Sequence, residues 1–347
     1  MSGIKDFANR LGMPRLIMSI FLLLLLIMVA VYQLPFSMIV SQSITRSGIN
    51  MVLALAMVPA IKSGIGMNFG LPLGIICGLI GGLISLEYNI TGLLGILAAW
   101  LISVPLAIAA GWVYGLLLNK VKGSELMVGT YVGFSVVSLM CIAWLKLPFN
   151  NPSLGWAMGD GLRVTITLDE WYDKALNELW AFEVFGVTIP TGLILTCALF
   201  CFLVWIYIRS RTGMSLMAGG SNPNFARYNG INPNRTRVVG AILSTVIAAL
   251  GIIVYAQGFG FYQLYSAPMT MAFPAVAAVL IGGASAAKIK ISNVVIGTTL
   301  FQSILAIASP VAAAIFPEGN LAEVFRVIVS NGIILYALSR FEGGRHK

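Results

Sequence analysis

Residues 209–237 read RSRTGMSLMAGGSNPNFARYNGINPNRTR and lie between two apolar runs, 190–208 and 238–258. Each run has the length of about 20 residues that a helix needs to cross the hydrocarbon core. The segment between them carries five arginines and no carboxylate. Because Lys and Arg gather in the cytoplasmic loops of membrane proteins, we expect this segment to face the cytoplasm. It predicts a docking surface rather than a plain connector.

The composition supports a membrane protein throughout. Of the 347 residues, 59% are hydrophobic and 10% are charged, whereas soluble domains carry about 25% charged residues. We therefore predict an all-α, polytopic bundle forming one domain, 1–347, and interpret the first apolar run as a span rather than a signal peptide. The ten predicted spans are 16–34, 48–66, 70–86, 91–118, 126–145, 187–208, 238–258, 268–286, 291–309 and 323–339.

The charge distribution predicts the orientation of the chain. With both termini in the cytoplasm, 16 of the 21 Lys and Arg residues lie on the inner side, as the positive-inside rule requires. The five on the outer side are Arg46, Lys146, Arg163, Lys174 and Arg326. The basic net charge thus reflects topology, and no nucleic-acid partner is expected.

One long loop, 146–186, is predicted to lie outside. Thr167 and Glu170 have the spacing of a capping box, and apolar residues follow near helical periodicity. We expect an amphipathic helix on the outer surface, with Trp171 and Trp180 at the lipid headgroups. Two interpretations stay open, a surface that contacts a partner and a lid with no partner.

The sequence lacks the chemistry of an enzyme or of an ion-coupled carrier. Lys62, Glu87 and Glu125 lie near span ends, a phosphate-binding GxxxxGK[ST] motif is absent, and His346 is the single histidine. Cys197 and Cys201 lie one turn apart without His or acidic neighbours, which favours packing over metal binding. We predict no catalytic residue, metal or cofactor, and a conduit whose energy arrives through the cytoplasmic segment.

Within that segment the sequence predicts a short, self-contained helix. Gly219 and Gly220 indicate a break, Ser221 or Asn222 is a suitable cap, and Pro223 suits the first helical position. Gly230 is typical of a helix end. Phe225, Ala226 and Ile231 would supply apolar contacts to a soluble partner and Arg227 a charge. The alternative is an ordinary surface turn.

This segment resembles the permease subunits of bacterial ABC importers for ribose and other simple sugars, a family that includes branched-chain amino acid and nucleoside permeases. The family pattern G-x-N-x-x-A-A-x-x-x-G-I-N is matched at Gly220, Asn222, Ala226, Gly230, Ile231 and Asn232. The run AVAAVLIGG at 275–283 is similar to the family's AIAAVVLGG, Gly297-Thr298 follows, and GVTIP at 186–190 is similar to its entry to the sixth span. The resemblance covers roughly residues 45–340.

The resemblance implies a permease of the bacterial cytoplasmic membrane with three kinds of partner. These are an ATP-binding subunit, a second permease copy or paralogue, and an external solute-binding protein. Coupling to the ATP-binding subunit would involve Gly220, Asn222, Phe225, Ala226, Arg227, Gly230, Ile231 and Asn232.

The chain departs from the family where cargo is expected to pass. SGIGMNFG at 63–70 stands where sugar permeases carry GGIDLSVG, so Gly66 occupies the aspartate position and Asn68 the serine position. After the Gly282-Gly283 pair, ASAAK replaces the usual glycine-rich run. We expect a sugar as cargo, with a nucleoside or purine as the alternative.

A weak internal similarity suggests an inverted repeat of spans 2–5 and 7–10. Met67-Asn68-Phe69 and Met271-Ala272-Phe273 each precede an apolar run that ends in a glycine pair. If the repeat holds, both breaks lie near a central pathway. The residues predicted to line it are Asn68, Phe69, Phe273, Pro274 and Gln302; the alternative for the two amides is interhelical hydrogen bonding.

Two functions from other classes remain as alternatives. One is an ion-coupled carrier that works alone, against which the scarcity of charged residues within the spans argues. The other is an exporter or scaffold subunit.

Overall fold

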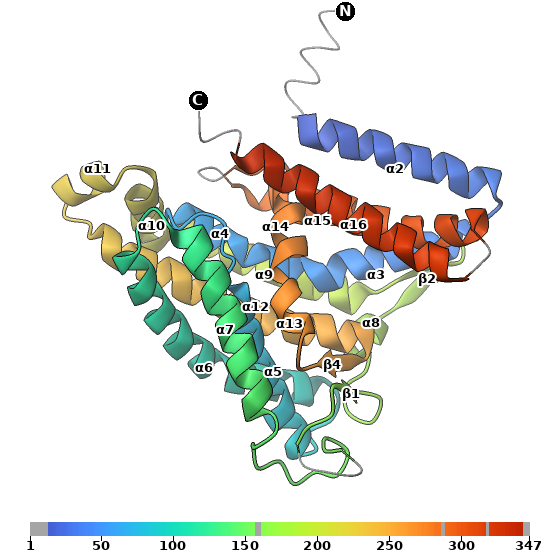
Figure 1. The fold of residues 1–347 in the computed structure, drawn as a ribbon, viewed down its shortest axis with the longest axis horizontal. Coiled ribbons are helices and arrows are strands. Elements are labelled where there is room, and N and C mark those ends of the chain that lie inside the picture. The colour runs from blue at the N-terminus through green and yellow to red at the C-terminus, as the bar shows by residue number, and fades with distance from the viewer. Residues whose placement is uncertain (1–12, 157–160, 286–288, 317–318, 343–347) are drawn as a thin grey trace, which may run out of the picture.

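The computed structural model describes residues 13–156, 161–285, 289–316 and 319–342. Both chain ends and Lys288, which entered the charge count, lie outside the described residues. Figure 1 shows a bundle of helices with α10 and α11 at one end and strands β1 and β4 towards the opposite end.

The first half of the bundle contains long apolar helices and one break. Its helices are α2 (Met13–Val31), α3 (Phe36–Leu55), α4 (Met57–Lys62), α5 (Leu71–Glu87), α6 (Gly92–Lys120) and α7 (Glu125–Ala143). Helix α4 continues the direction of α3 as one candidate span, Phe36–Lys62. The break between α4 and α5 contains Gly64 and Gly66, both with positive φ, which only glycine adopts at little cost.

The second half begins after a segment with little helix. That segment holds β1 (Thr165–Thr167), α8 (Ala175–Glu178), β2 (Phe182–Val184) and β3 (Val187–Ile189). The remaining elements are α9 (Thr191–Arg209), α10 (Arg211–Ser221), α11 (Pro223–Tyr228), α12 (Pro233–Phe259), β4 (Phe261–Gln263), α13 (Ala267–Thr270), α14 (Ala272–Ile281), α15 (Ile291–Ile315) and α16 (Gly319–Glu342).

The polytopic all-α class is confirmed, but the number of ten spans is not. Among the described residues, seven helices are long and apolar enough to cross a membrane. Two further predicted spans correspond to shorter apolar helices, 71–87 and 267–281. The last one corresponds to α16, which is not among these seven helices.

Several predicted boundaries were wrong for identifiable reasons. Helix α3 begins at Phe36 rather than near residue 48, because Ser43 and Ser47 donate hydrogen bonds to carbonyl oxygens one turn back and so fit within the helix. Arg46 therefore lies inside α3 rather than in the loop before the predicted span. Arg326 lies inside α16, within the span predicted at 323–339. The start predicted at 187 falls on β3, so α9 begins at Thr191.

Helix α12 lies at the centre, packed against α3, α5 and α6. Small residues allow this close approach: a Cβ on Gly111 of α6 would lie 2.8 Å from the Cα of Ile242, and one on Gly115 would lie 2.8 Å from the Cα of Val238. Interfaces between membrane helices are rich in such small residues, because dispersion contacts drive the packing. Helix α15 in turn packs against α2, α3, α14 and α16.

The predicted external amphipathic helix was wrong. Residues 165–167 form β1, which pairs antiparallel with β4, and the one helix between them and α9 is the single turn of α8. Trp171 is buried, and its Nε1 donates to Asn89 Oδ1 at 3.3 Å. Trp180 is exposed, as expected. Burial of aromatic side chains beneath the segment outweighs the weak local helical pattern.

Candidate functional site

Helix α11 has the caps that the sequence predicts. Asn222 Oδ1 accepts a hydrogen bond from the Phe225 amide at 3.0 Å, and Pro223 occupies the first helical position. At the other end the Ile231 amide donates to Ala226 O and the Gly230 amide donates to Arg227 O, with Gly230 at φ +74°. These two bonds around a left-handed glycine form a Schellman motif. The helix thus keeps its shape without a partner.

The exposed face of α11 is aromatic. Phe225 is 61% exposed and Tyr228 is 92% exposed. They are three residues apart and lie on neighbouring turns of one face. Tyr228 was missed in the sequence, although its spacing from Phe225 was the available signal. Ala226, expected to contact a partner, is fully buried against its own chain, and Ile231 is half-buried.

The expected break at Gly219 and Gly220 is absent, since both residues lie inside α10. Glycine is required there for a different reason. A Cβ on Gly220 would lie 2.7 Å from the backbone N of Gly64, and one on Gly64 would lie 2.9 Å from the Cα of Gly220. Gly220 therefore packs the end of α10 against the α4–α5 break instead of facing a partner.

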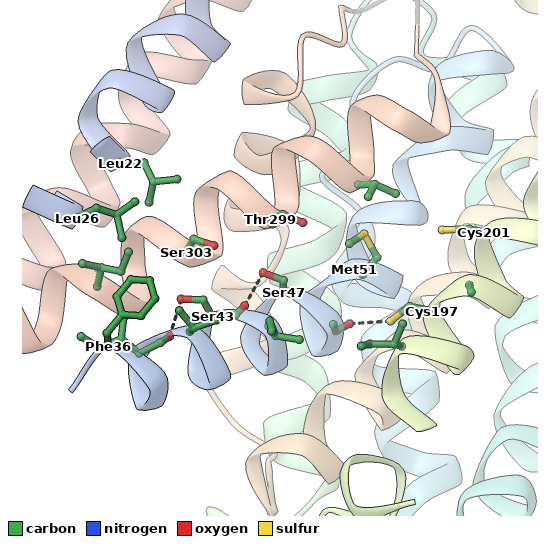
Figure 2. Close-up of a pocket in the computed structure, with 18 residues that line it drawn as sticks. Leu22, Leu26, Phe36, Ser43, Ser47, Met51, Cys197, Cys201, Thr299 and Ser303 are labelled. Atoms are coloured by element: carbon green, nitrogen blue, oxygen red, sulfur yellow. Dashed lines mark hydrogen bonds between the residues drawn. The ribbon is translucent and has the colours of Figure 1, made fainter. Parts of the chain in front are cut away.

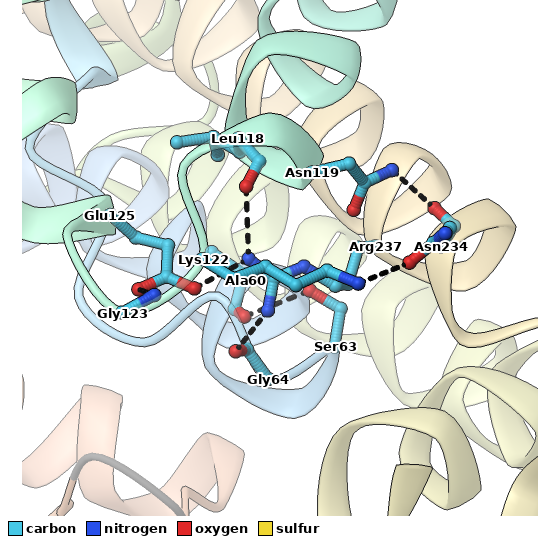
Figure 3. A network of polar contacts seen from close by, with 10 residues as sticks. All are labelled: Ala60, Ser63, Gly64, Leu118, Asn119, Lys122, Gly123, Glu125, Asn234 and Arg237. Atoms are coloured by element: carbon cyan, nitrogen blue, oxygen red, sulfur yellow. Dashed lines mark hydrogen bonds and ion pairs between the residues drawn. The ribbon is translucent and has the colours of Figure 1, made fainter.

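Arg237 in the second turn of α12 joins three elements (Figure 3). Its Nη2 lies 2.7 Å from Glu125 Oε1 at the start of α7, and both side chains are 11% exposed. Nη1 donates to Gly64 O at 3.1 Å, and Nη2 also donates to Leu118 O at 3.3 Å. Sequence reasoning noted Glu125 only as a residue near a span end. The sequence did not indicate that Glu125 and Arg237 pair, because they are separated by 112 positions.

A second polar contact supports the same junction. Lys122 Nζ donates to Asn234 Oδ1 at 2.6 Å, and Asn119 Nδ2 donates to Asn234 O at 2.8 Å. Figure 3 shows that these contacts connect the end of α6 and the α6–α7 loop to the first turn of α12. Asn232, predicted as a coupling residue, caps that turn by accepting from the Asn234 and Arg235 amides. The segment that carries α11 is therefore anchored to the first half of the bundle.

The five predicted pathway residues separate into three places. Phe69 and Phe273 meet with ring centroids 5.5 Å apart in an edge-to-face arrangement. Pro274 and Gln302 line a cavity of about 60 Å³ together with Asn50, Tyr255 and Thr298. The hydroxyl of Thr298 is buried there and has no hydrogen-bond partner among the described residues.

Asn68 precedes Phe69 in the chain but makes its contacts at a third place, and it is 2% exposed. Its Nδ2 donates to Ser244 Oγ at 2.8 Å, and its Oδ1 accepts from the Tyr114 hydroxyl at 2.9 Å and from the Gly70 amide at 3.0 Å. These bonds join α5, α6 and α12. In this conformation Asn68 therefore makes the interhelical hydrogen bonds that were the alternative interpretation.

A larger groove of about 610 Å³ lies between α2, α3, α9 and α15 (Figure 2). Its walls are mostly apolar, with hydroxyls from Ser43, Ser47, Thr299 and Ser303. The hydroxyls of Ser43 and Ser47 donate hydrogen bonds to carbonyl oxygens of their own helix. Cys197 Sγ donates to Gly48 O at 3.2 Å. The groove is suited to an apolar occupant. Its lining on α15 does not include Thr298 or Gln302, which line the smaller cavity.

The segment 146–186 and the end of α7 both contact the region around β4 in the second half of the bundle. The hydroxyls of Tyr172 and Tyr262 lie 2.9 Å apart in a buried pair, and Trp144 Nε1 donates to Leu264 O at 3.2 Å. Burial raises the pKa of the Tyr172 hydroxyl above its ordinary value, because the charged phenolate is poorly solvated there. No group of three or more potential metal ligands occurs among the described residues.

Comparison with known proteins agrees with this arrangement. Residues 39–338 match the family described as branched-chain amino acid transport system / permease component. The chain is similar to the autoinducer 2 import system permease protein LsrC of Escherichia coli O9:H4 (strain HS), with 29% identity over 201 residues, covering 57% of this chain and 54% of that protein. It is also similar to the nucleoside ABC transporter permease protein NupB of Lactococcus lactis subsp. cremoris (strain MG1363), with 23% identity over 252 residues, covering 70% and 65%.

The chain thus spans between half and two thirds of the length of these curated relatives. The family match, in contrast, covers most of its own residues and includes α11, the α4–α5 break and the Arg237 junction. The chain belongs to the permease family of branched-chain amino acid transport systems.

Proposed function

We propose that this chain is the membrane permease of an ABC importer. It moves a small polar solute, for which a sugar is the first candidate, and the energy comes from ATP hydrolysed by a partner subunit. The main support for this proposal is the structure of α11. It is capped at both ends and presents Phe225 and Tyr228 to solvent. Exposed aromatic residues on a rigid element are typical anchors of a protein interface.

In this proposal both termini and α11 face the cytoplasm of a bacterial cell, and the strands face outwards. The ATP-binding subunit contacts Phe225, Arg227 and Tyr228. Gly220, Ala226, Gly230 and Asn232 act indirectly by shaping the segment that holds them. An external binding protein delivers the solute, and a second permease copy or a paralogue completes the pathway.

The pathway itself is proposed to pass Phe69, Phe273, Pro274 and Gln302. Amide and hydroxyl groups in the cavity beside Pro274 offer hydrogen bonds without charge, which suits a neutral solute. Phe69 and Phe273 close against each other in this conformation. A nucleoside is the second candidate solute, and the similarity to the nucleoside permease favours it.

The docking claim is tested by affinity purification of the tagged chain from its own cells. The double variant Phe225→Ala/Tyr228→Ala is compared with Phe185→Ala, which removes a 99% exposed aromatic residue in the strand-bearing segment. We expect the double variant to lose an ATP-binding subunit that the wild type and the Phe185 variant retain in stoichiometric amounts. Stoichiometric retention by the double variant would refute the docking surface.

The cargo is tested separately by uptake of radiolabelled ribose and uridine into cells with and without the chain. Competition by unlabelled sugars but not nucleosides supports the first candidate, and the reverse supports the second. Uptake by the purified chain alone in proteoliposomes without ATP would instead establish an ion-coupled carrier.

A further inference from the structure

Two adjoining hollows form a groove along α9, α10 and α12 at the α11 end of the bundle. Its outer part has a volume of about 580 Å³ and is lined by Arg211, Arg235, Thr212, Ser215 and Thr236 above an apolar floor. Its inner part has a volume of about 160 Å³ and an apolar lining. The two parts share Tyr207 and Leu216 as lining residues. The groove therefore has a polar, basic end and an apolar end.

The basic end contains positive charge without local compensation. Among the described residues, the guanidinium groups of Arg211 and Arg235 make no ion pair or hydrogen bond, and no carboxylate lines either part of the groove. Lys62 lines the inner part, where its ammonium group contacts the Met217 sulfur at 3.5 Å. A thioether is a weak acceptor for a cation. Arg211 and Arg235 thus line the outer part, and Lys62 lines the inner part.

The apolar end follows one face of each helix. On α12 the lining residues are Val239, Leu243, Ile247 and Leu250, spaced by three or four positions. At a rise of about 1.5 Å per residue this face extends for roughly 16 Å, which is close to half of the ~30 Å hydrocarbon core. At its deep end Trp100 of α6 meets Phe200 edge-on and its Nε1 donates to Leu250 O at 3.3 Å.

We propose that this groove binds a phospholipid with an anionic headgroup. The phosphate lies between Arg211 and Arg235, and one acyl chain lies along Leu243, Ile247 and Leu250. Basic pockets between transmembrane helices with this polarity suit acidic headgroups. A soluble subunit does not account for the inner part, because Leu243 and Leu250 lie within a membrane-length helix. The proposal concerns the isolated chain and depends neither on its cargo nor on ATP.

Native mass spectrometry of the purified chain tests the proposal, with phosphatidylglycerol and phosphatidylcholine as probes. We expect the wild type to retain phosphatidylglycerol in preference to phosphatidylcholine. Arg211→Gln and Arg235→Gln should each weaken retention of phosphatidylglycerol about fivefold, the factor that corresponds to ~1 kcal/mol per basic residue near a membrane surface. Arg209→Gln is the matched control, because Arg209 lies over the Trp205 ring, 4.1 Å from its centroid, and does not line the groove.

The apolar end has its own pair of variants. Leu203 lines the inner part, whereas the neighbouring Phe202 does not, and both are about half exposed. Leu203→Trp should fill the groove and reduce retention of the lipid, while Phe202→Trp should leave it unchanged. Equal retention by the Arg211, Arg235 and Leu203 variants and the wild type would overturn the proposal. So would an equal loss in the Arg209 control.

Discussion

Breaking the Arg237–Glu125 pair should destabilise the folded chain more than any other loss of a single charge pair in the described structure. The perturbation is Glu125→Gln, which removes the carboxylate charge and leaves a side chain of similar size. Both partners are 11% exposed, so solvent replaces little of the lost interaction. Removing one partner of a buried pair costs about 3–5 kcal/mol, because the other charge stays buried without compensation.

The structure places the expected cost at the lower end of that range. After the substitution Arg237 keeps its hydrogen bonds to Gly64 O and Leu118 O, so the expected loss of stability is about 3 kcal/mol. Arg237→Gln also removes both backbone contacts and should cost at least as much. The double variant removes both charges and should be more stable than the sum of the two single losses predicts, by about 2 kcal/mol or more.

The assay is the heat resistance of the detergent-solubilised chain, followed by fluorescence-detected size exclusion after brief heating. Glu323→Gln is the internal control, because its partner Arg326 lies one turn away and the two side chains are 34% and 62% exposed. An exposed pair contributes about 0–1 kcal/mol. The reasoning is refuted if Glu125→Gln and Glu323→Gln lower the melting temperature equally, or if the effects of Glu125→Gln and Arg237→Gln simply add.

Three further predictions concern orientation, packing and pH. In intact cells an impermeant maleimide should label Phe185→Cys but not Tyr228→Cys, and inverted vesicles should show the opposite; the same pattern in both would contradict the proposed topology. Gly78→Ala should lower stability by about 1–3 kcal/mol, because the added Cβ would overlap Ala249 O of α12. Gly332→Ala is the control: no atom lies within 4 Å of its added Cβ, so it should have no effect in the same melting assay. Burial raises the pKa of Tyr172 above its ordinary 10.0. The stability that its neutral hydroxyl contributes should therefore be constant below pH 10 and fall as the pH rises further. Tyr172→Phe should weaken this fall, and an unchanged pH profile of stability would exclude the mechanism.

The sequence was most informative where a short range of residues determines the local structure. The Asn222 cap, Pro223 and Gly230 act within a few positions of one another, so α11 was predicted almost to the residue. The longest predicted span, 91–118, likewise corresponds to the 29-residue helix α6. The two breaks were expected to lie near each other from a weak internal similarity rather than from local chemistry, but the contact between Phe69 and Phe273 was not predicted.

The errors arose where distant contacts override local preference. Gly219 and Gly220 indicated a break, yet they lie in a helix because Gly64 packs against Gly220. The capping-box spacing at Thr167 indicated a helix, yet the pairing of β1 with β4 and the buried Tyr172–Tyr262 contact determine the backbone there. The Arg237–Glu125 pair had no signal in a single sequence, because the separation of 112 positions hides it.

The α4–α5 break is the place where the α11 segment reaches the first half of the bundle. Gly64 contacts Gly220 of α10 through its backbone and accepts a hydrogen bond from Arg237 of α12. Five positions later, Phe69 meets Phe273 of the second half. Because close-packed elements shift as bodies rather than deform gradually, a displacement of α10 and α12 would move the break at Gly64 and at Asn68. In the proposed transporter, one short segment thus connects the contact between Phe69 and Phe273 to the docking helix α11. Asn68 holds that segment to α6 and α12 through its hydrogen bonds to Tyr114 and Ser244.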